Sequence, residues 1–131
     1  MKAIIIGASS GIGRELAKEL SRAGYALGIT GRRTDKLESL KSELDNRSVV
    51  CEMDLLNLDA SLKAFDELLL ELGDVDLVVI NSGVGYIDKT WPMDKELETV
   101  AVNVAGFTAI ANRSYHYFAK RGHGHLVGIS S

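Results

Sequence analysis

The sequence predicts an α/β fold in which a doubly wound parallel sheet lies between two layers of helices. Short apolar runs alternate with longer amphipathic segments along the chain. The apolar runs, such as residues 3–6, are continuous rather than alternating, which is typical of strands buried on both faces of a parallel sheet. The 131 residues, of which 46% are hydrophobic, suit one domain built in three layers around one sheet.

Five apolar segments are expected to form the strands. The first is residues 3–6, which Gly7 ends, and the second is residues 25–30, which Gly31 ends. The other strands are expected at residues 48–53, 75–80 and 125–129. The strand order expected for this sheet is 3-2-1-4-5, one of the orders common in doubly wound sheets.

Apolar residues at helical spacing predict a helix between each pair of successive strands. The first helix is expected over residues 11–23 and the third over residues 58–72, and a glycine follows each of them. Thr34 is expected to cap the second helix, and Asp94 to open a long fourth helix that continues through Phe118.

Composition and charge argue against several classes of protein. The net charge of -3 offers no basic surplus for nucleic acid, and no apolar run has the roughly 18 residues that span a bilayer. Cys51 is the one cysteine, so no internal disulfide can form. A soluble protein of the reducing cytoplasm is therefore expected. No metal site is expected, because His116, His123 and His125 lack partners at ligand spacing.

The turn between the first strand and the first helix has the sequence Gly-Ala-Ser-Ser-Gly-Ile-Gly, residues 7–13. Gly7 permits a tight turn, Gly11 lets backbone N–H groups approach a pyrophosphate, and Gly13 lets the helix pack closely on the sheet. The helix N-terminus adds a partial positive charge, and Ser9 and Ser10 add hydroxyl donors. The alternative is a plain strand-to-helix turn. A P-loop is excluded because no Lys-Ser or Lys-Thr follows the second glycine.

The spacing G-x-x-x-G-x-G resembles that of the short-chain dehydrogenase/reductase family, and the resemblance covers the whole chain. It implies a Rossmann-type domain over residues 1–131 that binds a nicotinamide dinucleotide. It also implies hydride transfer between that cofactor and a carbonyl or alcohol substrate. The glycine loop is then expected to contact the cofactor through Gly7, Ser9, Ser10, Gly11, Ile12 and Gly13.

Arg32 and Arg33 favour NADP over NAD. In dinucleotide-binding folds an acid near the end of the second strand binds the ribose 2′-hydroxyl of NAD, whereas arginine accommodates the 2′-phosphate of NADP. Here Gly31 takes the acidic position and Arg32 follows it. A guanidinium can pair with a phosphate through two hydrogen bonds. The alternative is a solvated basic turn.

Two further segments at strand ends match cofactor-binding elements of the similar family. Asp54 and Leu55 follow the third strand, where the family's aspartate helps hold the adenine ring; Asp54 could instead cap the third helix. Asn81, Ser82 and Gly83 resemble the family's Asn-Asn-Ala-Gly element. In that element Ile80 here replaces the first asparagine, and Ser82 replaces the alanine.

The resemblance places Asn103 and Ser131 in the catalytic set. Asn103 would help order a water in a proton relay, and Ser131 would bind the substrate oxygen. Asn103 could instead be a hydrogen-bonded polar group of the core.

The family also uses a tyrosine with a lysine four residues later, and none of the four tyrosines here has that lysine. The pair most similar to that pattern is Tyr117 with Arg121, which has arginine in place of lysine. We therefore expect an N-terminal portion of a longer enzyme, with the pair beyond residue 131 and no activity in this chain alone. The alternatives are a catalytically inactive NADP-binding sensor or interaction protein, and a flavin or other mononucleotide binder. A homo-oligomer is expected, since relatives commonly pair through the long helix and the helix after it.

Overall fold

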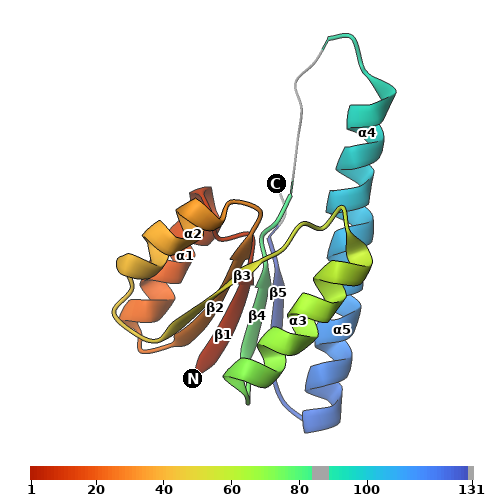
Figure 1. Ribbon diagram of the computed structural model, residues 1–131. Helices are drawn as coiled ribbons and strands as arrows, with labels where there is room; N and C mark the ends of the chain where they lie inside the picture. Colours follow the sequence, from red (N-terminus) through yellow and green to blue (C-terminus); the bar gives the residue numbers. More distant parts are fainter. Residues whose placement is uncertain (84–88, 130–131) are drawn as a thin grey trace.

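A computed structural model describes residues 1–83 and 89–129 and contains a five-stranded parallel sheet (Figure 1). The strand order is β3-β2-β1-β4-β5, which confirms the predicted order. Every neighbouring pair is parallel, and Ile6 of β1 lies between Thr30 of β2 and Ile80 of β4. The strands are β1 (Lys2–Ile6), β2 (Ala26–Gly31), β3 (Ser48–Glu52), β4 (Leu77–Ile80) and β5 (His125–Gly128).

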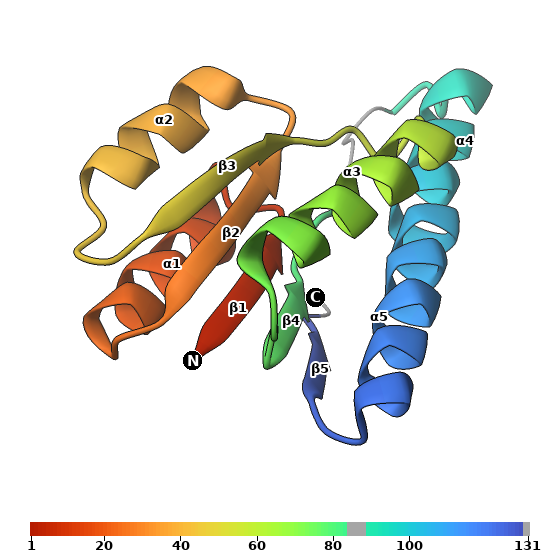
Figure 2. The same ribbon diagram turned by 60° about the horizontal axis from the view of Figure 1, so that its bottom comes forward.

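Helices cover both faces of the sheet, as the doubly wound prediction requires. Figure 2 shows α1 (Gly11–Arg22) and α2 (Thr34–Ser42) on one face, and α3 (Leu58–Leu72) and α5 (Phe107–Arg121) on the other. The predicted long helix is a continuous helical run of three parts: α4 (Met93–Val100), the π-helical η1 (Ala101–Gly106) and α5. α4 projects beyond the end of the sheet (Figure 1).

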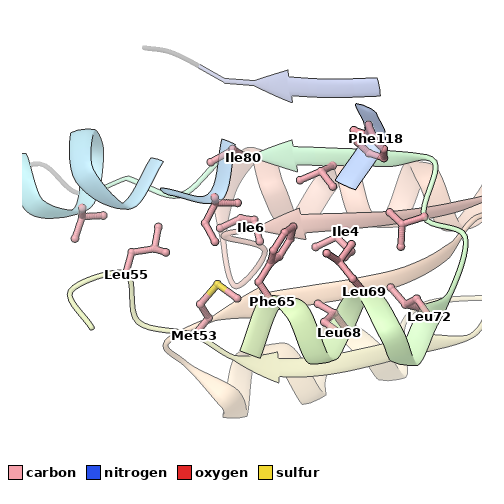
Figure 3. Close-up of a cluster of buried hydrophobic side chains, with 14 residues drawn as sticks. Ile4, Ile6, Met53, Leu55, Phe65, Leu68, Leu69, Leu72, Ile80 and Phe118 are labelled. Atoms are coloured by element: carbon pink, nitrogen blue, oxygen red, sulfur yellow. The ribbon is translucent and has the colours of Figure 1, made fainter. Parts of the chain in front are cut away.

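The core consists of one hydrophobic cluster on each face of the sheet. Successive strand residues point to opposite faces, so Ala3 and Ile5 pack under α1 and α2, while Ile4 and Ile6 pack under α3 and α5. Figure 3 shows Phe65 of α3 turned toward Ile4 and Ile6. Residues 3–6 of β1 are buried on both faces of the sheet, which explains why they are all apolar.

Two predicted helix caps are wrong. Arg33 occupies the N-cap position of α2, so Thr34 is its first helical residue, and no side chain caps this helix. Asn57, rather than Asp54, caps α3, and its side chain accepts a hydrogen bond from the Ala60 N–H at 3.3 Å. Both helices begin within three residues of the predicted positions, so the topology is unaffected.

No helix within the described residues has the length and apolar character needed to span a membrane.

Candidate functional site

A cleft opens at the carboxyl ends of β1, β2 and β4. The strand order reverses between β1 and β4, and in open α/β sheets this switch point is where ligands bind. The lining residues come from the ends of these strands and the loops after them, from the loop after β3 and from the helical run before α5: Ile6, Gly7, Ser9, Ser10, Thr30, Gly31, Arg32, Met53, Asp54, Leu55, Asn81, Ser82, Gly83 and Val102.

The start of the glycine loop is tied to β2 by hydrogen bonds to Thr30. The Ala8 N–H donates to the Thr30 carbonyl at 2.8 Å, and the Gly7 N–H donates to the same carbonyl at 3.2 Å. The Thr30 hydroxyl donates to the Ile5 carbonyl at 3.2 Å. Gly7 has φ +88°, a left-handed conformation that favours glycine. These contacts hold the loop in one path at the mouth of the cleft.

The close approach of three backbone segments requires glycine at positions 7 and 13. A Cβ on Gly13 would lie 2.0 Å from the Gly7 carbonyl oxygen, and a Cβ on Gly7 would lie 2.8 Å from Cα of Ser82. The Asn81 side-chain amide donates to the Gly7 carbonyl at 3.1 Å. The loop, α1 and the end of β4 are therefore packed together without space for side chains.

The outer part of the loop is open. Gly11 has φ +60°, and no heavy atom of the described residues would lie within 4 Å of a Cβ placed on it. Ser10 occupies the N-cap of α1 but its side chain caps no N–H group. The start of α1 therefore offers backbone N–H groups and the positive end of a helix dipole to an anion. Ile12 is exposed, and it does not line the cleft.

The two arginines after β2 lie in different places. Arg32 is exposed at the rim of the cleft. Arg33 is not among the lining residues, and its guanidinium lies 3.8 Å from the carboxylate of Asp35. Ser9 packs beside Gly31, because a Cβ on Gly31 would be 3.4 Å from the Ser9 hydroxyl oxygen. The rim next to Gly31 thus presents one guanidinium and one hydroxyl.

The loop after β3 connects the cleft with the long helix. Asp54 is exposed and accepts a hydrogen bond from the Leu56 N–H at 3.0 Å. Leu55 is 5% exposed and packs on η1 so closely that a Cβ on Gly106 would lie 2.8 Å from the Leu55 Cβ.

Asn103 lies in the π-helical segment beside the end of β4. It is exposed, so the interpretation as a core polar group is wrong. A Cβ on Gly83 would lie 3.3 Å from the Asn103 side-chain oxygen. π-Helical turns inside α-helices occur frequently at functional sites. Ser131, the other predicted catalytic residue, lies outside the described residues.

Tyr117 and Arg121 lie at the opposite end of the sheet. The Tyr117 hydroxyl accepts a hydrogen bond from the Val75 N–H at 3.0 Å, and Arg121 donates to the Val75 carbonyl. The Arg121 guanidinium also lies 5.2 Å from the Tyr117 ring centre. Val75 precedes β4 and Asn81 follows it six residues later, a span of roughly 20 Å at the rise of a strand. This pair therefore stabilises the base of β4 and is remote from the cleft.

Sequence reasoning missed several lining residues, of which Thr30 is the most informative. It is a buried polar residue in an otherwise apolar strand, directly before Gly31. A polar residue at that position could have been predicted to lie at the cleft. Met53 and Val102 carry no such signal, because they resemble ordinary core residues.

Cys51 lies outside the cleft. Burial raises the pKa of its thiol above the usual value, and the nearby carboxylates of Glu67, Glu71 and Glu52 raise it further. The described residues contain no group of three or more His, Cys, Asp or Glu side chains arranged to hold a metal ion.

The sheet order and the glycine loop at its switch point define a Rossmann-type α/β protein. The family description "short chain dehydrogenase" matches residues 1–131, and the chain belongs to this family of oxidoreductases.

Individual relatives support this assignment. An uncharacterized oxidoreductase of Myxococcus xanthus is 37% identical over 98% of this chain and 53% of its own length. The alcohol dehydrogenase of Thermococcus sibiricus, complexed with 5-hydroxy-NADP, is 30% identical with a TM-score of 0.85 over 96% of this chain and 56% of its own. The 3-ketoacyl-(acyl-carrier-protein) reductase of Brucella melitensis, complexed with NADH, is 25% identical with a TM-score of 0.88, over 99% of this chain and 56% of its own. The chain thus spans about half the length of these proteins.

Proposed function

We propose that this chain is a single NADP(H)-binding unit of an enzyme that transfers a hydride between NADP(H) and a carbonyl or alcohol substrate. The position of Arg32 at the rim of the cleft, directly after Gly31, is the observation that supports a preference for NADP(H). An acid at position 31 would repel a 2′-phosphate, whereas Gly31 leaves room for it and Arg32 supplies a positive charge beside it. Solved relatives are complexed with an NADP derivative in one case and with NADH in others, so the proposed preference for NADP(H) depends on Arg32.

The cleft fits a dinucleotide. Its floor is glycine backbone without room for side chains, and the uncapped start of α1 faces the place of a pyrophosphate. Asp54 and Leu55 would hold the adenine side, and Asn81, Ser82 and Gly83 the ribose side. The bound cofactor would supply the hydride donor or acceptor.

Asn103 and Ser131 are proposed to act on the substrate side, Asn103 by ordering a water and Ser131 by binding the substrate oxygen. None of the tyrosines in the chain precedes a lysine by four residues, so a general acid with a cation to lower its pKa is missing from it. We therefore expect the isolated chain to bind cofactor without turnover. That behaviour would equally suit an NADP-binding sensor, and turnover of generic ketones with NADPH would exclude the sensor.

The variant Arg32→Asp tests the cofactor preference. Removing charge-assisted hydrogen bonds to the 2′-phosphate and adding a like charge should raise the Kd for NADPH about 10- to 100-fold. The Kd for NADH should stay the same or fall, because an acid at this place can accept from the ribose hydroxyls. Isothermal titration calorimetry with both cofactors gives the two Kd values.

Arg22→Asp is the matched control, since Arg22 is an exposed arginine at the far end of α1 whose nearest acid is Glu19. This variant carries the same charge change and should leave both Kd values unchanged. An unaltered NADPH affinity in Arg32→Asp would refute the role of Arg32.

We also propose that the chain pairs with a second copy of itself through an apolar stripe on the exposed face of the long helix. The stripe, here the long-helix stripe, consists of large side chains that are each more than half exposed: Met93, Leu97, Val100, Val104 and Tyr115. Residues three and four apart share one face of a helix, which gives Met93, Leu97 and Val100 a common surface. A surface of this kind can pair with its own copy about a two-fold axis.

A further inference from the structure

The hydroxyl of Ser82 stands out among the polar groups at the cleft. Ser82 belongs to the cleft wall, yet its Oγ is shielded from solvent and has no hydrogen-bond partner within the described residues. Its neighbours Asn81 and Gly7 are engaged with each other through the amide-to-carbonyl bond at 3.1 Å.

A buried hydroxyl without a partner loses its hydrogen bonds to water and gains none in return. Other buried serines of this chain avoid that cost. Ser114 donates to the Ile110 carbonyl at 2.7 Å, and Ser61 donates to the Asp54 carbonyl at 2.7 Å. An unsatisfied buried group in a native structure calls for a specific explanation, such as a functional role.

The position of Ser82 indicates which group could accept a hydrogen bond from its hydroxyl. Its Cα lies against Gly7, directly after the paired ends of β1 and β4, where the strand order of the sheet reverses. A dinucleotide held by the glycine loop passes this point with its phosphates and riboses, which are rich in oxygen acceptors. A change of χ1 moves the serine oxygen between staggered positions, and rotation about the Cβ–Oγ bond directs its proton, so the hydroxyl can turn toward the cleft without a backbone shift.

We propose that Ser82 is a cofactor-binding residue whose hydroxyl donates a hydrogen bond to an oxygen of the phosphate–ribose backbone of the bound dinucleotide. This inference rests on the proposed cofactor site and adds a donor that alanine, the residue of the similar family's element, cannot supply. The apo chain holds the hydroxyl unpaired, and binding pairs it.

The test is Ser82→Ala in the full chain, measured in two ways. Thermal unfolding without cofactor should show an unchanged or higher Tm, higher by up to about 4 °C, because an unpaired buried hydroxyl is removed. Calorimetric titration with NADPH should show a Kd raised about 5- to 20-fold, because the new hydrogen bond is lost. This opposite sign separates a donor to the cofactor from a structural serine, whose loss would lower the Tm and leave the Kd unchanged.

Ser114→Ala is the matched control, because Ser114 is a fully buried serine with an internal partner. Its NADPH Kd should equal that of the wild type. Equal Kd values for wild type and Ser82→Ala would overturn this inference while leaving the proposed function intact. A wild-type chain that binds neither NADPH nor NADH would overturn both.

Discussion

At the scale of single residues, glycines of one loop serve different physical needs. Gly13 is buried and leaves no space for even one methyl group, because the Gly7 carbonyl occupies the place of its Cβ. Gly11 is exposed and needs only its left-handed φ of +60°. Gly13 maintains the packing of α1 on the sheet, and Gly11 shapes the backbone that faces an anion.

This difference predicts unequal effects of alanine. Gly13→Ala should lower the free energy of unfolding by about 3 kcal/mol or more, because a rigid backbone atom blocks the new methyl group. Gly11→Ala should lower it by about 1 kcal/mol, the cost of a left-handed conformation for a non-glycine residue. Urea unfolding of both variants measures the two losses. Similar losses in the two variants would contradict the packing role of Gly13.

The exposure of Asn103 depends on residues far from it in the sequence. Its surroundings in sequence are apolar, which is typical of a core position, yet the π-helical segment leaves it exposed beside Gly83. The segment ends at Gly106, against which Leu55 packs from the loop after β3. The place of Asn103 therefore depends on a contact between residues 51 positions apart.

At the scale of elements, the start of α3 depends on a side-chain cap. Asn57 accepts a hydrogen bond from the Ala60 N–H, one of the N–H groups that the helix itself cannot satisfy. Ser61 of the same turn donates to the Asp54 carbonyl. The first turn of α3 is thereby linked to the loop that carries Asp54 and Leu55.

Asn57→Ala should lower the free energy of unfolding by about 1 kcal/mol, the usual cost of losing an N-cap. Asn57→Asp should stay within a few tenths of a kcal/mol of the wild type, because a carboxylate accepts the same hydrogen bond. Urea unfolding distinguishes the two. Equal destabilisation by both substitutions would mean that the cap contributes nothing and that another contact of Asn57 matters.

At the scale of the whole molecule, the two faces of the sheet are closed by helices, but the long-helix stripe remains exposed. Leu70 is another exposed apolar residue, at 83% of its surface, but it belongs to α3 and not to the long helix. Scattered exposed apolar residues are ordinary, whereas a contiguous group marks an interaction surface.

The double variant Leu97→Glu, Val104→Glu tests the proposed pairing. Two carboxylates facing their own copies across a two-fold axis should prevent association, because they would be desolvated next to like charges. Sedimentation velocity should show a dimer or larger species for the wild type and a monomer for the variant. Leu70→Glu is the control and should associate like the wild type. A monomeric wild-type chain would refute the pairing.

The sequence by itself determined the strand order, the position of the glycine loop and the family. The elements and the loop are local in character: a continuous apolar run makes a buried strand, helical spacing makes a helix, and three glycines at fixed spacing make the turn between them. The strand order is not local, and it was predictable only because these elements match a known type of doubly wound sheet. The position of Arg32 at the cleft was predictable from the local sequence, because Arg32 comes directly after the last residue of β2.

The tertiary structure alone decided which of the neighbouring polar residues share the cleft. It brings Arg32 to the rim and turns Arg33 toward Asp35, separates Tyr117 from the cleft, and buries the Ser82 hydroxyl without a partner among the described residues. It also places the π-helical segment where Leu55 meets Gly106. The places of Tyr117, Ser82 and the π-helical segment depend on contacts between segments far apart in the chain, whereas the periodicity of a sequence indicates only which face of each element is buried.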